Sequence, residues 1–89
     1  MNKIPLEAGR VVRSTAGRDG GRLFVVIAEV DQDFVLVADG SLRKIDRPKK
    51  KRRKHLYALP QLMPSIVNQM PEDHQIRNYI RANVPNEEG

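Results

Sequence analysis

Cysteine is absent from this sequence of 89 residues. Disulfide bonds and thiolate metal sites are therefore excluded. Long apolar runs are also missing, because the longest, residues 23–28, is far too short to cross a bilayer. Residues 1–9 contain no stretch like the hydrophobic region of a signal peptide. We therefore expect a soluble, cytoplasmic protein of one domain, whose short chain limits the apolar area it can bury.

The residue patterns of a catalytic site are missing as well. No cysteine can act as a nucleophile, and the two histidines, His55 and His74, are far apart in the sequence and lack metal-ligand spacing. Asp31 and Asp33 suit a turn better than an acid/base pair. The glycine-rich segment at residues 16–21 lacks the lysine-serine ending of a phosphate-binding loop. We expect no enzymatic activity, no metal, no cofactor and no small-molecule substrate.

Positive charge is concentrated in one segment. The whole chain has 16 Lys and Arg and 11 Asp and Glu, a formal net charge of +5. Residues 43–54 hold nine cations and one acid, so this segment is +8, and +5 minus 8 leaves −3 for the rest. The nine cations are Arg43, Lys44, Arg47, Lys49, Lys50, Lys51, Arg52, Arg53 and Lys54. A slightly acidic body with one dense cationic segment is typical of a protein that binds a polyanion.

The first part of the chain has the pattern of a small β domain. Strands are expected at residues 11–15, 23–30 and 34–38, separated by the glycine-rich turn at 16–21 and a tight turn at 31–33. The second and third strands are too apolar for one of their faces to be exposed to solvent. They are therefore expected to be buried on both sides or to curl around a small barrel core.

The dipeptide Asp39-Gly40 predicts a hairpin turn that leads into a fourth strand at residues 41–45. Residues 47–53 are expected to form a solvated loop, because like charges repel and none of these side chains suits a core. Residues 55–59 return to β-prone residues and supply a fifth strand. Five short strands favour a small antiparallel barrel over residues 1–60, with a basic loop at residues 43–54.

Residues 61–89 are expected to form a helical extension. Pro64 opens a short helix through Met70. A second helix starts near Glu72 and carries a stripe of apolar residues: Ile76, Tyr79, Ile80 and Val84. We expect this stripe to pack on the barrel and residues 86–89 to be frayed. His74, near the helix start, is expected at the surface.

Several spaced motifs resemble a known family. Residues 9–12, residues 16–22 and residues 25–27 resemble the KOW motif of ribosomal and transcription-elongation proteins. The chain is most similar to the fourteen-e type of large-subunit ribosomal protein and its small bacterial relatives, with further similarity at residues 34–40, 42–45 and 54–56. The likeness covers residues 6–59, with a weaker echo at residues 73–82. Gly20 and Phe24 depart from the general motif, which has lysine and glycine there, and this disfavours the elongation-factor branch.

The resemblance implies an SH3-like barrel of KOW type that binds ribosomal or other structured RNA without catalysis. It also implies that the turn carrying Arg18 and Arg22 approaches the RNA, where its glycines would let backbone N–H groups come close to a phosphate. A plain hairpin turn with two solvated arginines fits these residues equally well. His55 is open to a phosphate contact or to a structural role at a strand end.

The chemistry of the basic segment favours phosphate contacts. Six consecutive cations at residues 49–54 would repel one another with no benefit to a plain solvated loop, whereas an RNA backbone neutralises them. The segment has no aromatic residue to stack on unpaired bases, which favours folded or double-helical RNA. No apolar face lies beside it to insert into a membrane. A nuclear-localisation signal is a weaker interpretation, and only the resemblance separates RNA from DNA.

The predicted RNA-contacting residues are Arg18, Arg22, Arg43, Lys44, Arg47, Lys49, Lys50, Lys51, Arg52, Arg53, Lys54 and His55. Ribosomal RNA is the first partner expected, and the ribosome itself is the second. An alternative hypothesis is a protein-interaction adaptor of the ribosome or the transcription machinery, which would use the barrel edge or the C-terminal stripe and in which the basic segment only steers encounter.

Overall fold

The computed structural model describes residues 4–64 and 69–84. Its strands are β1 (Arg10–Ser14), β2 (Leu23–Glu29), β3 (Phe34–Ala38), β4 (Lys49–Arg52) and β5 (Leu56–Leu62). Two 3-10 turns, η1 (Gly17–Asp19) and η2 (Arg53–His55), and the helix α1 (Asp73–Asn83) complete the described elements. The prediction of a mainly β domain with a C-terminal helix is confirmed.

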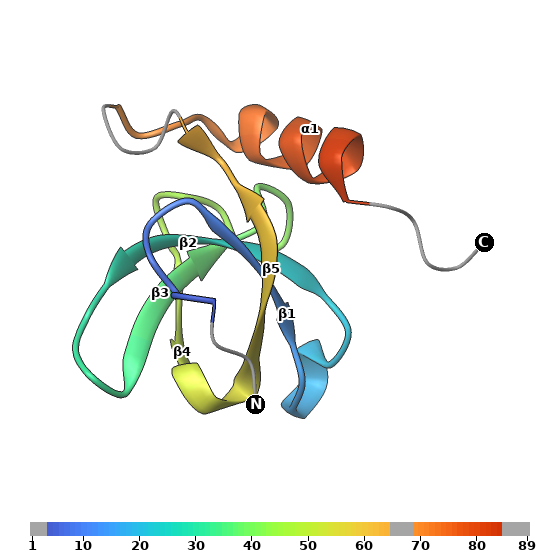
Figure 1. The fold of residues 1–89 in the computed structure, drawn as a ribbon. Coiled ribbons are helices and arrows are strands. Elements are labelled where there is room, and N and C mark those ends of the chain that lie inside the picture. The colour runs from blue at the N-terminus through green and yellow to red at the C-terminus, as the bar shows by residue number, and fades with distance from the viewer. Residues whose placement is uncertain (1–3, 65–68, 85–89) are drawn as a thin grey trace.

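All five strands form one antiparallel sheet in the order β4-β3-β2-β1-β5 (Figure 1). The strands β4 and β5 are its two edges, and the sheet is not closed into a hydrogen-bonded barrel across the described part of the chain. The turn η2 connects these two edges directly, and Thr15 N–H donates to the His55 carbonyl at 2.8 Å. The sheet therefore curves so that its edge strands meet through a turn.

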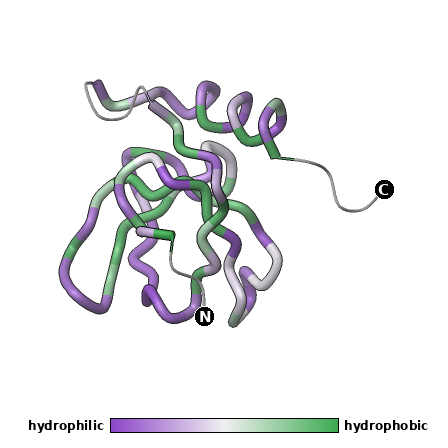
Figure 2. The backbone as a smooth tube through the Cα atoms, in the orientation of Figure 1, coloured by the Kyte–Doolittle hydropathy of each residue, from purple (hydrophilic) through white to green (hydrophobic). Residues whose placement is uncertain are grey.

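The strands β2 and β3 are largely buried on both faces, as their apolar runs predicted. One face carries Val12, Phe24, Val26, Val35, Val37 and Leu56, which form the inner cluster. The opposite face carries Val11, Val25, Ile27 and Ala38, which pack with Met63, Ile76 and Val84 as the outer cluster. Neighbouring residues of one strand enter different clusters, because successive side chains of a strand point to opposite faces. Figure 2 shows the resulting apolar strands at the centre of the fold.

The helix α1 lies against the outer face of the sheet (Figure 1). Ile76 is fully buried in the outer cluster, and Tyr79 and Ile80 pack against its margin. The N-terminus of α1 is capped, since the Gln75 side chain accepts a hydrogen bond from Glu72 N–H at 2.8 Å. The predicted apolar stripe therefore packs on the sheet, with Ile76 and Val84 buried and Tyr79 and Ile80 half-buried.

A buried guanidinium ties the N-terminal segment to β5. Arg10 donates from Nε to Pro5 O at 3.1 Å and from Nη1 to Leu59 O and Pro60 O at 3.3 and 3.0 Å. Its Nη2 pairs with Glu7 at 2.7 Å. The rigid fork of donors on an arginine suits this set of carbonyls and a carboxylate, which a lysine cannot satisfy together. Arg10 is therefore a structural residue.

Two predicted elements in the middle of the chain are wrong. Residues 41–45 do not form a strand; they belong to a connection between β3 and β4. The fourth strand is instead Lys49–Arg52, inside the segment expected to be a solvated loop. It pairs with β3 through Val37↔Lys49, Leu36↔Lys50, Val35↔Lys51 and Phe34↔Arg52.

The remaining boundaries agree closely or cannot be compared. The strand β3 has the predicted ends, β1 is displaced by one residue, and β2 ends one residue earlier than predicted. The strand β5 was predicted at residues 55–59 and covers Leu56–Leu62. Most of the short helix predicted from Pro64 to Met70 lies outside the described residues, as do residues 86–89. In the described ranges, no helix has both the length and the apolar character to span a membrane.

Candidate nucleic-acid interface

The strand β4 separates the cations of the basic segment into two sets. Lys49 and Lys51 lie opposite Val37 and Val35, which belong to the inner cluster. Lys50 and Arg52 lie opposite Leu36 and Phe34, on the other face. The separation follows from the two-residue period of a strand. Consecutive cations in the sequence therefore have different environments, which a solvated loop would not impose.

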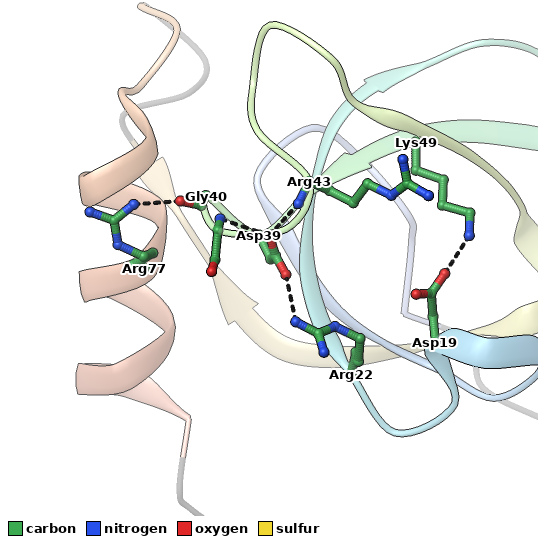
Figure 3. Close-up of polar contacts among 8 residues, drawn as sticks. Asp19, Arg22, Asp39, Gly40, Arg43, Lys49 and Arg77 are labelled. Atoms are coloured by element: carbon green, nitrogen blue, oxygen red, sulfur yellow. Dashed lines mark hydrogen bonds and ion pairs between the residues drawn. The ribbon is translucent and has the colours of Figure 1, made fainter.

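Lys49 and Lys51, the inner set, are neutralised by a carboxylate of the protein itself. Asp19 of η1 accepts a hydrogen bond from Lys49 Nζ at 2.5 Å and lies 3.6 Å from Lys51 Nζ (Figure 3 shows the first pair). The side chains of Lys51 and Asp19 are only 9% and 16% exposed, so these charges are largely removed from water. The hydrogen bond from Lys49, helped by the charges of both lysines, lowers the pKa of Asp19 although burial opposes this.

Lys50 and Arg52, the outer set, are exposed and lie over an aromatic ring instead of a carboxylate. Lys50 Nζ lies 4.6 Å from the centroid of the Phe34 ring, and the guanidinium of Arg52 lies 5.0 Å from it. Cations near an aromatic face gain about 0.5–1 kcal/mol at exposed sites. Neither side chain forms an ion pair with another described residue. Phe34 thus positions two cations side by side without neutralising them.

Arg53, the first residue of η2, has a structural role. Its Nη2 pairs with Glu29 at 2.9 Å, and its Nε donates to Asp31 O at 2.9 Å. Its backbone N–H donates to Asp33 O at 2.8 Å. The Asp31 side chain closes the predicted turn by accepting from Asp33 N–H and Phe34 N–H. Arg53 therefore joins the β2–β3 hairpin to the end of β4.

The connection between β3 and β4 is held in place at several points. Asp39 Oδ1 accepts from Ser41 N–H and Arg43 N–H at 2.8 and 2.9 Å, and its Oδ2 pairs with Arg22 at 3.3 Å. Figure 3 shows this network and, beside it, the Arg77 guanidinium of α1 donating to Gly40 O. The connection is therefore held by Arg22, directly before β2, and by Arg77 of α1, and we call residues 39–48 the pinned loop.

The pinned loop carries three further cations of the basic segment. Arg43, Lys44 and Arg47 are exposed, and none of their side chains forms an ion pair with a residue in the described ranges. Asp46, the one acid of the segment, is exposed beside them. The loop leads into β4 at Lys49, so the exposed cations of the loop are followed in the chain by Lys50 and Arg52.

The glycine-rich turn differs from an anion-binding nest. Gly20 N–H donates to Gly17 O, Gly21 N–H to Ser14 O and Arg22 N–H to Asp19 O, all within 3.1 Å. These donors are therefore already used inside the protein, which favours the plain-turn interpretation of the glycines. Arg18 remains exposed, whereas Arg22 pairs with Asp39.

The predicted contact residues thus divide into two groups. Arg22, Lys49, Lys51 and Arg53 are paired with the protein's own carboxylates. The cations that are exposed and have no ion pair with another described residue are Arg18, Arg43, Lys44, Arg47, Lys50, Arg52 and Lys54. His55 is half-buried in η2, and His74 is exposed beside Glu72.

No family model matches this chain. Across residues 4–64 and 69–84, no group of three or more His, Cys, Asp or Glu is placed to hold a metal ion. The interface must therefore be judged on its own geometry: exposed cations on β4 and the pinned loop, over a sheet whose inner cations are already compensated.

Two residues of this interface were not predicted from the sequence. Phe34 lies outside the basic segment, and Asp19 lies in a turn interpreted through its glycines and arginines. The alternation of β4 would have placed Phe34 opposite Arg52 had the strand been recognised. No signal in the sequence assigns Asp19 to the lysines, because that contact spans 30 residues and depends on the curvature of the sheet.

Proposed function

We propose that this chain is a non-enzymatic RNA-binding protein of SH3-like, KOW-type fold that holds the phosphates of structured RNA, with ribosomal RNA as the first partner. The observation that carries the proposal is the outer face of β4, where Lys50 and Arg52 stand exposed over Phe34 and no described carboxylate neutralises them. Such cations bind a polyanion by replacing its condensed counterions. A cytoplasmic location and an association with ribosomes are parts of the same proposal.

Protection of an edge strand is a second explanation for the basic residues of β4, and it accounts for fewer of the exposed cations. Lysines on an edge strand discourage pairing with the edge of another sheet, and inward-pointing charges do the same. Lys49 and Lys51 fit that explanation. It does not require Arg43, Lys44 and Arg47, which lie outside the strand on an ordered loop and are also exposed. Phosphate binding accounts for both sets of exposed cations.

The adaptor hypothesis loses one of its two surfaces. Ile76 is fully buried, and Tyr79 and Ile80 pack at the margin of the outer cluster, so this stripe already has its partner within the chain. The edge of β5, where Tyr57 is half exposed, is the surface left to that hypothesis. A protein complex that survives nuclease and high salt would favour the adaptor.

Binding of labelled hairpin RNA, followed by fluorescence anisotropy at low salt, tests the proposal. We expect Lys50→Gln with Arg52→Gln to weaken binding about tenfold or more, since two phosphate contacts are lost. Arg81→Glu on α1 changes the net charge by the same two units and is the matched control, with little effect expected. A DNA hairpin of the same sequence measures the preference for RNA. Absence of RNA binding, or equal loss in the control, would overturn the proposal.

A further inference from the structure

A hollow lies between the pinned loop and the start of α1. The phosphate contacts proposed for Lys50 and Arg52 do not use it. It is open to solvent and has a volume of about 520 Å³. Its walls are Ile45 and Asp46 from the loop, Pro71 from the segment before α1, and Glu72, Asp73, His74 and Arg77 from the start of the helix. It therefore combines apolar surface with hydrogen-bonding groups.

The walls of this hollow are fixed relative to each other. Asp73 Oδ1 accepts a hydrogen bond from Ile45 N–H at 2.8 Å, and Arg77 donates to Gly40 O. Gly40 has φ of +77°, and the backbone of Asp73 fills the place that a Cβ at this position would occupy. The loop and α1 are therefore in backbone contact, so the hollow exists before any ligand binds. A preformed site loses little conformational entropy on binding.

The acids at the hollow indicate what it accepts. The Asp73 carboxylate is used by Ile45, and the Glu72 carboxylate belongs to the capping box with Gln75 and lies 3.4 Å from His74 Nδ1. Asp46 is the exposed acceptor at the hollow, and it forms no ion pair with another described residue. Carboxylates repel phosphate but accept hydrogen bonds from the amino group of a base, as Asp and Glu do from cytosine in nucleic-acid complexes. Pro71 is buried, so Ile45 supplies the apolar surface for the face of a ring, and the exposed His74 supplies a planar side chain at the rim.

The cations of the loop stand next to this hollow in the chain. Arg43 and Lys44 precede Ile45 and Asp46, and Arg47 follows them. We propose that the hollow takes the base of an unpaired nucleotide bearing an exocyclic amino group, while Arg43, Lys44 and Arg47 hold the phosphates that flank it. This inference rests on the proposed RNA binding and names the RNA element: a duplex interrupted by an unpaired nucleotide, whose base is free of the stack.

Three RNA hairpins with one common stem test the inference: a perfect stem, a stem with one bulged cytidine and a stem with one bulged uridine. Uridine lacks the amino group, so we expect the protein to bind the cytidine bulge about tenfold more tightly than the other two. Asp46→Asn should reduce the preference for cytidine over uridine, because an amide also offers a donor to the uridine carbonyl. His74→Ala should weaken binding of the bulged RNA and leave the perfect stem unchanged.

Asn78→Ala, an exposed change on α1 that does not line the hollow, is the matched control and should keep the preference. Thermal unfolding of each variant shows whether the fold is retained. Equal affinity for all three hairpins, or an unchanged preference in both Asp46→Asn and His74→Ala, would overturn this inference and leave the proposed function standing. Failure to bind any hairpin would instead overturn the proposed function.

Discussion

Asp19 and Lys49 form a hydrogen-bonded ion pair of 2.5 Å between η1 and β4. The pair links the turn after β1 to an edge strand that β1 does not contact through the sheet, and Lys51 shares the same carboxylate at 3.6 Å. One acid therefore neutralises the two cations that β4 directs toward the inner cluster. This contact explains how a strand of four basic residues is tolerated.

Removal of this carboxylate should destabilise the fold. Asp19→Asn would leave Lys49 and Lys51 near the apolar inner cluster without a counter-charge, and we expect a loss of about 1–3 kcal/mol in the free energy of unfolding. Asp33→Asn, at an exposed position whose carboxylate forms no hydrogen bond or ion pair with another described residue, removes the same charge and should change stability little. Urea unfolding of the two variants and the parent protein measures the difference. Equal stability of all three would show that the pair contributes nothing.

The stability should also depend on pH through Asp19. Its pKa is lowered in the folded state by the hydrogen bond from Lys49 and by the charges of both lysines. The stabilisation is therefore complete above the pKa of an unfolded aspartate, about 3.9, and is lost as the pH falls through the lower pKa of the folded state. Unfolding midpoints measured from neutral to acidic pH should fall less steeply in Asp19→Asn than in the parent protein. Parallel curves for the two proteins would contradict this assignment.

The strand β4 could not be predicted from the local sequence pattern. The basic segment was predicted to be a loop because local charge repulsion and weak β propensity both disfavour a strand. Two residues far away in the sequence support the strand: Asp19 neutralises the inner cations, and the Phe34 ring lies under the outer ones. The apolar strands and α1 were predictable because their signals are local and periodic. Compensation of charge by distant residues was not.

Substitution of Gly40 should loosen the attachment of α1. Alanine at this position would collide with the backbone of Asp73 and would also take the left-handed conformation with φ of +77°. Gly21 has φ of +87° and open space around it, so Gly21→Ala shows the conformational cost alone, about 1–2 kcal/mol. We expect Gly40→Ala to lower the free energy of unfolding by clearly more than this control. Equal losses in thermal or urea unfolding would mean that the loop moves away at no cost.

Replacement of Arg10 by lysine should be poorly tolerated although the charge is kept. An ammonium group cannot reach Pro5 O, the two β5 carbonyls and Glu7 together, so buried acceptors lose their donors. We expect a loss of about 2–3 kcal/mol in Arg10→Lys. Arg18→Lys, at an exposed position of η1, makes the same chemical change and should be close to neutral. Thermal unfolding of both variants decides between a structural Arg10 and a replaceable one.

The site residues, like the strands, could be predicted from the sequence only in part. The composition of residues 43–54 was enough to predict a polyanion-binding segment, but not which cations are available to a partner. Availability depends on strand alternation and on acids elsewhere, which set aside Lys49, Lys51 and Arg53 as structural. The hollow beside α1 could not be predicted, because its walls come from a loop and a helix that are separated in the sequence.

The salt dependence of RNA affinity tests the central claim most directly. We would measure the dissociation constant for one hairpin RNA over a series of salt concentrations in the parent protein, in Lys50→Gln with Arg52→Gln, and in Arg81→Glu. Each phosphate contact adds about 0.7–0.9 to the log–log slope, so loss of the two outer cations of β4 should lower it by about 1.5. Arg81→Glu should keep the parent slope. A slope unchanged in the β4 variant would contradict the assignment of Lys50 and Arg52 to phosphate binding.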